Sequence, residues 1–396
     1  MRYYNAKSSY FSTDGWGLSA DQRSVGDRYF QPRWDRSSAF VTDTSLQYQL
    51  DQGAVKHTML VGFDYSRPKH ETERYEQVAA DLDVFNPVYG QPVGPISPYY
   101  RSSLRNDYKR LGIYAQDQMK INDKLILLVG GRYDKVRFNE RNFFTDEVVA
   151  DNEKSSAFTG RLGAVYLAEN GIAPFFSYSE SFEPTQGQDR LGSRFKPTTG
   201  QQYEAGVRYQ PKGSSTMISA AVFQLSRQNL LVPDPQDASR AFNMQAGEVR
   251  SRGFELEARG SIGRHANIIA AYAYTDVRTT RASPLQPDEL DKRSIGVPYN
   301  QLSLWGDYSF GAFGLPGLKA GMGARYIGET RGMAYGVPVS LPAFTLIDAM
   351  VGYTNGPWRF ALNFTNLTDK TYVASCSYGC FYGEPRRIIS TATYRW

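Results

Sequence analysis

Residues 107–139 constrain the fold most, because their side chains alternate with a period of two along both arms of a hairpin that reverses at Asn122-Asp123. Successive side chains of a strand point to opposite faces, so this period predicts strands. Each arm has roughly 14 residues, against ~5–6 in a typical globular strand. Long arms joined by a tight turn are typical of a transmembrane β-barrel. One face carries Leu111, Ile113, Ala115, Met119, Ile121, Leu125, Leu127, Val129, Gly131 and Tyr133, and the other carries Arg110, Tyr114, Gln116, Gln118, Lys120, Arg132 and Asp134.

The rest of the chain repeats this unit, and short turns alternate with long loops. Asn355-Gly356 is a strong hairpin turn of this kind. In a soluble β-sandwich, short and long connections are not expected to alternate. The pattern therefore predicts an all-β, antiparallel transmembrane β-barrel with about sixteen strands. Strands are expected at 2–10, 38–50, 55–66, 155–169, 172–184, 201–210, 216–229, 248–260, 266–277, 297–310, 318–328, 343–354, 357–368 and 384–396, and long loops at 11–35, 67–105, 140–155, 185–199 and 230–247.

Composition permits this fold. Mean hydropathy is −0.49, and no apolar run approaches the ~18 residues that a membrane helix needs. A barrel with a polar lumen also averages hydrophilic, and 28 Tyr and 22 Phe suit its interfacial girdles. The net charge of +5 comes from 45 basic and 40 acidic residues without a basic block, so nucleic acid is not an expected partner.

The two cysteines, Cys376 and Cys380, lie in the segment CSYGC. If they form a disulfide, the pairing is forced. We favour a disulfide over two free thiols, which implies an oxidising compartment. A zinc site needs four ligands and no histidine lies nearby, so no metal ligands are predicted.

The sequence contains no motif that indicates a catalytic site. His57, His70 and His265 are the only imidazoles, and no GxSxG segment is present. No nucleophile, base and acid set can be assembled from their spacing. The sequence therefore predicts a protein that is not an enzyme and has no catalytic residues.

Several segments match a known family. The chain resembles the barrel of a TonB-dependent outer-membrane receptor for ferric siderophores, of the ferric-hydroxamate type, over residues 36–396. The residues that carry the resemblance are LGIYAQDQMKINDKL (111–125), GGRYD (130–134), SYSESFEPTQG (177–187), GSRFKPTTGQQYEAGVRYQP (192–211), GEVRSRGFELEARG (247–260), NFTNLTDKTYVASC (363–376) and YGEPRRIISTATYRW (382–396).

The resemblance implies a location in the bacterial outer membrane, surrounded by its lipid, and uptake of a ferric siderophore driven through the TonB complex. Iron is then carried by the siderophore, so no cofactor is required. The terminal aromatic falls on Trp396, which is expected to signal to the barrel assembly machinery.

Aromatic loop residues are the candidate ligand contacts, because aromatic rings give a large rigid surface and tyrosine adds a polar tip. Packing within the loops or in a girdle stays open for each of them. Charges on the lumen face are instead expected to pair across the wall: Arg132, Glu255, Glu257, Arg259 and Arg325. The ligand candidates are Tyr99, Tyr100, Phe143, Phe144, Phe242, Tyr335, Tyr378, Phe381 and Tyr382.

Two departures from the family matter. Family barrels belong to the 22-stranded, plugged class, and no counterpart of the plug domain or the TonB box is found. Residues 1–396 are therefore expected to be a partial receptor barrel, inactive alone. The alternatives are a passive porin-like channel, if about sixteen strands close as a smaller barrel, and a soluble or surface β-protein.

Overall fold

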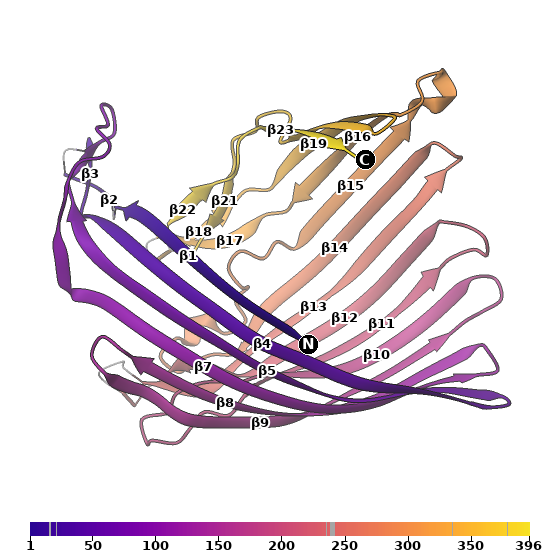
Figure 1. Ribbon diagram of the computed structural model, residues 1–396, viewed down its shortest axis with the longest axis horizontal. Coiled ribbons are helices and arrows are strands. Elements are labelled where there is room, and N and C mark those ends of the chain that lie inside the picture. Colours follow the sequence, from indigo (N-terminus) through magenta and orange to yellow (C-terminus); the bar gives the residue numbers. More distant parts are fainter. Residues whose placement is uncertain (16, 21, 235, 238–241, 335, 378) are drawn as a thin grey trace.

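The computed structural model describes the chain except residues 16, 21, 235, 238–241, 335 and 378, and the side chains of 97–101 also lie outside the description. Sixteen strands form one antiparallel sheet, in which each strand pairs with the next long strand of the chain. The sheet curves strongly from β1 to β23 (Figure 1). The predicted strand count and fold class are confirmed. The sixteen are β1 (Arg2–Asp14), β4 (Arg28–Gln52), β5 (Val55–Ala79), β7 (Val93–Ile121), β8 (Leu125–Asn142), β9 (Glu147–Tyr166), β10 (Ile172–Glu183), β11 (Thr198–Tyr209), β12 (Met217–Pro233), β13 (Asn243–Ile262), β14 (Ala266–Arg281), β15 (Asn300–Ser309), β16 (Leu318–Ile327), β19 (Phe344–Asn355), β20 (Trp358–Thr365) and β23 (Arg387–Tyr394).

Short elements lie in the connections between these strands. Among the described residues, no helix is long and apolar enough to cross a membrane. Long loops lie at the left of Figure 1 and short turns at the right. The short elements are β2 (Gly17–Leu18), β3 (Ser24–Gly26), β6 (Leu82–Asp83), β17 (Thr330–Ala334), β18 (Val337–Leu341), β21 (Val373–Cys376), β22 (Cys380–Tyr382) and the 3₁₀ turns η1 (Pro287–Glu289) and η2 (Phe310–Phe313).

The hairpin of β7 and β8 has the predicted register and faces. Ile113 pairs with Tyr133, and Tyr114 pairs with Arg132. Ile113 and Tyr133 are 55% and 48% exposed, as expected for side chains that face lipid. From Leu125 to Tyr133 the apolar face covers about 27 Å along β8, at ~3.4 Å per residue.

Exposed aromatic side chains lie near the short turns on six of the sixteen strands. Each of them lies close to the end of its strand, on the apolar face. Such girdles sit at the level of the lipid headgroups. We call this set the inner aromatic belt: Tyr48, Tyr166, Tyr209, Tyr353, Trp358 and Tyr394.

The strands near the chain start are longer than predicted. The loop expected at 67–105 is wrong, because β5 continues to Ala79 and β7 begins at Val93. The loop predicted at 11–35 is also shorter than expected, because β1 continues to Asp14 and β4 begins at Arg28. These extensions lie beyond the apolar band, and their side chains do not alternate between apolar and polar, so no apolar face marks them as strands. Backbone pairing holds them, as between Glu71 and Arg105.

Candidate functional site

The loop between β10 and β11 (residues 184–197) folds across the inner side of the wall. Gln186 Nε2 donates to the hydroxyl of Tyr108 on β7, which shares a face with the lumen residue Tyr114. The backbone N–H of Gly187 donates to Glu153 of β9 at 3.4 Å. The loop therefore closes over two strands that precede its own hairpin.

Two further loops connect to this one. The Arg190 side chain donates to Gln236 at 2.6 Å and lies 3.5 Å from the carboxylate of Asp234, both in the β12–β13 loop. The Ser283 hydroxyl, only 2% exposed, donates to the carbonyl of Pro233 at 2.7 Å. Consecutive loops are thus joined by specific polar contacts.

Arg331 of β17 extends the chain of contacts to the β14–β15 loop (residues 282–299). Its guanidinium donates to Glu289 at 3.0 Å and to the carbonyl of Arg293 at 3.0 Å, with 17% of the side chain exposed. The hydrogen bond from Arg331 holds the pKa of Glu289 below its ordinary value. The Arg293 guanidinium lies 3.4 Å from the ring centre of Tyr299. We call the described residues of the connected loops 184–197, 234–242 and 282–299, with β17 and β18, the loop canopy.

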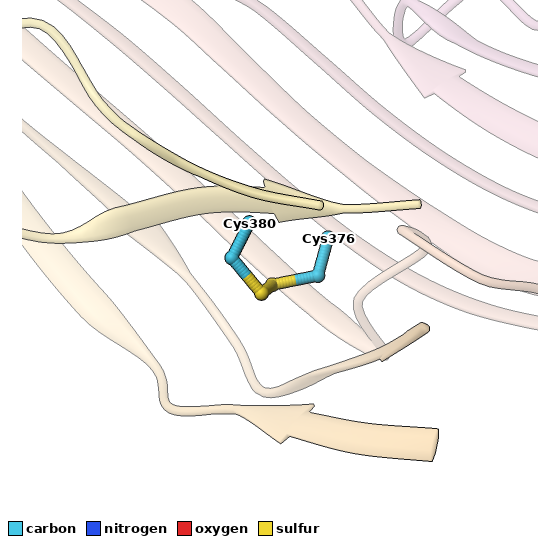
Figure 2. The surroundings of a disulfide bond; sticks show 2 residues. All are labelled: Cys376 and Cys380. Atoms are coloured by element: carbon cyan, nitrogen blue, oxygen red, sulfur yellow. A yellow bond between two sulfur atoms is a disulfide. The ribbon is translucent and has the colours of Figure 1, made fainter. Parts of the chain in front are cut away.

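The hairpin of β21 and β22 lies beside β17 and β18. Figure 2 shows the disulfide that joins Cys376 and Cys380, with an S–S distance of 2.02 Å. Cys376 is 4% exposed, whereas Phe381 of the same hairpin is 61% exposed. The bond closes a very short loop and holds the two strands of the hairpin together.

Replacing both cysteines with alanine is expected to destabilise this hairpin by about 2 kcal/mol, from the chain entropy of a loop of about five residues. Hydrogen exchange of the amides of Val373–Cys376 and Cys380–Tyr382 measures the effect. The wall strands β19 and β20 serve as the internal control and keep their protection. Unchanged exchange in the hairpin would show that the surrounding contacts, and not the disulfide, order it.

The structure places the described ligand candidates on three separate loops. Phe143 and Phe144 lie in the β8–β9 turn, with the Arg105 guanidinium 5.6 Å from the Phe143 ring. Phe242 precedes β13 and donates its N–H to Asp237 at 2.7 Å. Phe381 and Tyr382 lie on β22 and are exposed. Tyr335, Tyr378 and the side chains of Tyr99 and Tyr100 lie outside the described residues. Ligand contact by these residues stays a prediction, as does the assembly role of the fully exposed Trp396.

Two of the lumen charges pair across the wall as predicted. Arg132 of β8 contacts Asp64 of β5 and Asp134 of its own strand, each at 2.5 Å. Arg325 contacts Asp348 on the neighbouring strand at 2.5 Å. The prediction is wrong for the other three within the described residues, because Glu255 and Glu257 have no ion pair and Arg259 donates to the sulfur of Met217 at 3.8 Å. All three side chains are exposed.

Glu140 lies near the loop end of β8, beyond the apolar band. Burial raises its pKa, and the nearby Glu153 carboxylate raises it further. The folded protein therefore takes up this proton at a higher pH than the unfolded chain, and the fold gains stability as the pH falls through the raised pKa.

Glu140→Gln is expected to remove this gain. Urea unfolding midpoints, taken at intervals from about pH 7 down to about pH 4, near the ordinary pKa of a glutamate, measure it in both proteins. Glu147→Gln, at an exposed position of β9, is the control and retains the pH response. An equal response in the parent protein and Glu140→Gln would contradict the assignment.

Sequence reasoning did not find the residues that join the loops, namely Arg190, Ser283 and Arg331. No local signal marks them, because each partner lies on a different loop and only the folded barrel brings the two together.

Comparison with known proteins places the chain among outer-membrane receptors. Residues 1–367 match the family described as TonB dependent receptor-like, beta-barrel. The chain belongs to this family. The receptor barrel is 32% identical over 430 residues to the ferrichrome outer membrane transporter/phage receptor of Escherichia coli K12, covering 100% of this chain and 56% of that protein. It is 36% identical over 378 residues to the ferrioxamine B receptor of Salmonella typhimurium, covering 93% and 52%.

Solved structures agree on the fold. The receptor barrel superposes on the ferric-catecholate import receptor Fiu of Escherichia coli K12 with a TM-score of 0.82 at 19% identity, covering 99% of this chain and 60% of that one. The chain spans about half the length of the curated relatives it matches.

The family confirms the predicted outer-membrane location. Its named members are transport receptors and not enzymes. The comparisons give no support to the porin-like channel or to a soluble β-protein.

Proposed function

We propose that this receptor barrel takes part in the uptake of ferric siderophores of the hydroxamate class across the outer membrane, and that it catalyses no reaction. One observation carries the proposal. Relatives at 31–36% identity are named for ferrichrome, ferrioxamine B and ferrioxamine, which are hydroxamate siderophores.

In this proposal the loop canopy captures the ferric siderophore on the outer side. Contacts such as Arg331 to Glu289 hold the loops in one arrangement before ligand arrives, which lowers the entropy lost on binding. Iron enters already coordinated by the siderophore and is cargo, so no cofactor is needed. The energy comes through the TonB complex, and the barrel assembly machinery inserts the barrel into lipid.

Uptake of radioactive iron tests the proposal in Escherichia coli that lacks its own hydroxamate receptors and expresses the full natural protein. We expect uptake from ferrioxamine B or ferrichrome that is lost when TonB is deleted, and no uptake from ferric citrate. Uptake of all three without TonB would indicate a passive pore. Failure of the purified protein to bind either ferric hydroxamate would overturn the proposal.

Arg331→Gln is expected to weaken binding of the ferric hydroxamate, because it releases β17 from the β14–β15 loop. Equilibrium binding to the purified protein in detergent measures this. Arg227→Gln is the matched control, since Arg227 pairs with Glu183 between wall strands and joins no two canopy loops. Equal affinity of both variants would show that the canopy contacts do not organise the ligand site.

A further inference from the structure

The turn between β15 and β16 differs in length and chemistry from its neighbours at the short-turn end. Residues 310–317 read FGAFGLPG and contain no charged side chain. Figure 1 shows its 3₁₀ turn η2 as the short orange coil at this rim. Four other turns at the same end carry charges, whereas the β4–β5 and β19–β20 turns are uncharged but only two residues long. The charged residues are Asp123, Lys124, Glu169, Lys212 and Arg264.

Backbone contacts give this turn a defined shape. The N–H of Leu315 donates to the carbonyl of Phe310 at 3.3 Å, and the N–H of Thr354 donates to the carbonyl of Gly317 at 3.0 Å. Gly314 ends the 3₁₀ turn with a φ of 74°, a conformation that favours glycine. We call residues 310–315 the apolar knob.

The knob folds back against the outer surface of the barrel. The rings of Phe310 and Phe313 lie 5.1 Å and 5.9 Å from the ring of Tyr308, centre to centre. Tyr308 is on the same face of β15 as Leu302 and Leu304, which are exposed towards lipid. Phe313 itself is 68% exposed and Leu315 is 51% exposed. The knob therefore presents apolar side chains outward beside the end of a wall strand.

The inner aromatic belt shows where the knob lies relative to the membrane boundary. Tyr353 on β19 belongs to the belt and pairs with Leu318, four residues after Gly314. Exposed aromatic and aliphatic side chains at this level contact the boundary between headgroups and acyl chains. The knob continues an existing lipid interface, and it carries no charge with which to select a protein partner.

We propose that the apolar knob is an interfacial anchor that inserts Phe313 and Leu315 into the periplasmic leaflet of the outer membrane. Short turns of such barrels face the periplasm, and removing exposed apolar area from water provides the driving force. The inference rests on the outer-membrane location and is independent of the ligand transported.

Site-directed spin labelling in phospholipid vesicles tests the anchor. Phe313→Cys is labelled without reductant, because the native cysteines are joined in a disulfide. Collision with oxygen, which partitions into lipid, is compared with collision with a water-soluble nickel chelate. Val351→Cys on the lipid face and Lys212→Cys on a charged turn are the references. Leu315→Cys provides a second labelled position should Phe313→Cys fold poorly.

We expect the label at 313 or 315 to favour oxygen over nickel severalfold more than the label at 212, and to approach the ratio at 351. A ratio equal to that at 212 would place the knob in water and overturn the proposal. Protection from both reagents would indicate burial against protein, such as a second copy of the chain, and would also overturn it.

Discussion

Gly253→Ala is expected to lower the free energy of unfolding by about 3 kcal/mol or more, as overpacking against rigid neighbours does. A Cβ atom at this position of β13 would lie 1.9 Å from the carbonyl oxygen of Tyr274 on β14. The ring of Phe223 on β12 would lie 3.2 Å away on the other side. The obstacle is backbone, so the strand itself has to move. Urea unfolding in vesicles, followed by the heat-modified mobility of the folded barrel, measures the loss.

Gly163→Ala is the control for this variant. A Cβ there has its nearest neighbour at 3.6 Å, an ordinary contact with Leu128. Loss of glycine flexibility in the unfolded chain then makes the change neutral or stabilising, by up to about 1 kcal/mol. Equal unfolding midpoints for the two alanine variants would mean that the β13–β14 pair accommodates a side chain at no cost.

Arg132→Met is expected to cost about 3 kcal/mol, the low end of the range for breaking a buried pair, because a third of this side chain is exposed. Arg132 ties Asp64 of β5 to Asp134 of β8, and its guanidinium lies 5.7 Å from the ring centre of Tyr114 on the intervening β7. Gly112 provides the room, since a Cβ there would lie 1.8 Å from the guanidinium. Methionine leaves two carboxylates facing each other without a cation.

A double-mutant cycle isolates this effect. Adding Asp64→Asn to Arg132→Met removes one of the two carboxylates and is expected to recover part of the lost stability. Lys124→Met removes an exposed pair with Glu169 that joins two turns, and it is expected to change stability by less than about 1 kcal/mol. A loss for Arg132→Met no larger than for Lys124→Met would show that the lumen pair does not brace the wall.

The part of the fold that faces lipid was predictable from residues, because lipid imposes the strict alternation seen at Ile113 and Tyr133. The extensions of β5 and β7 were not predictable, since their residues show no alternation between apolar and polar side chains. At the candidate site, sequence predicted aromatic loops but not their connections. The partners of Arg190 and Arg331 lie on other loops. Only the folded sheet brings them together, so no local segment predicts the contacts.

The charges on the lumen face were likewise predictable only in part. Alternation placed Arg132 and Arg325 on the inner face correctly. Arg325 pairs with Asp348 on the neighbouring strand, whereas Arg132 reaches across β7 to Asp64 on β5. The same reasoning failed for Glu255 and Glu257, because register, and not face, decides which side chains meet.

The contacts within the loop canopy bear on how this surface can be redesigned or can diverge. Surface loops usually accept substitution one at a time. Here Arg190 pairs with Asp234 and Arg331 pairs with Glu289. Each arginine therefore contacts a second loop that is distant in the sequence. Replacing one loop with that of a relative that has another ligand preference would leave the charged residue on the second loop without its ion-pair partner. A successful transplant has to carry the paired loops together, and changes at these positions are expected to occur in pairs.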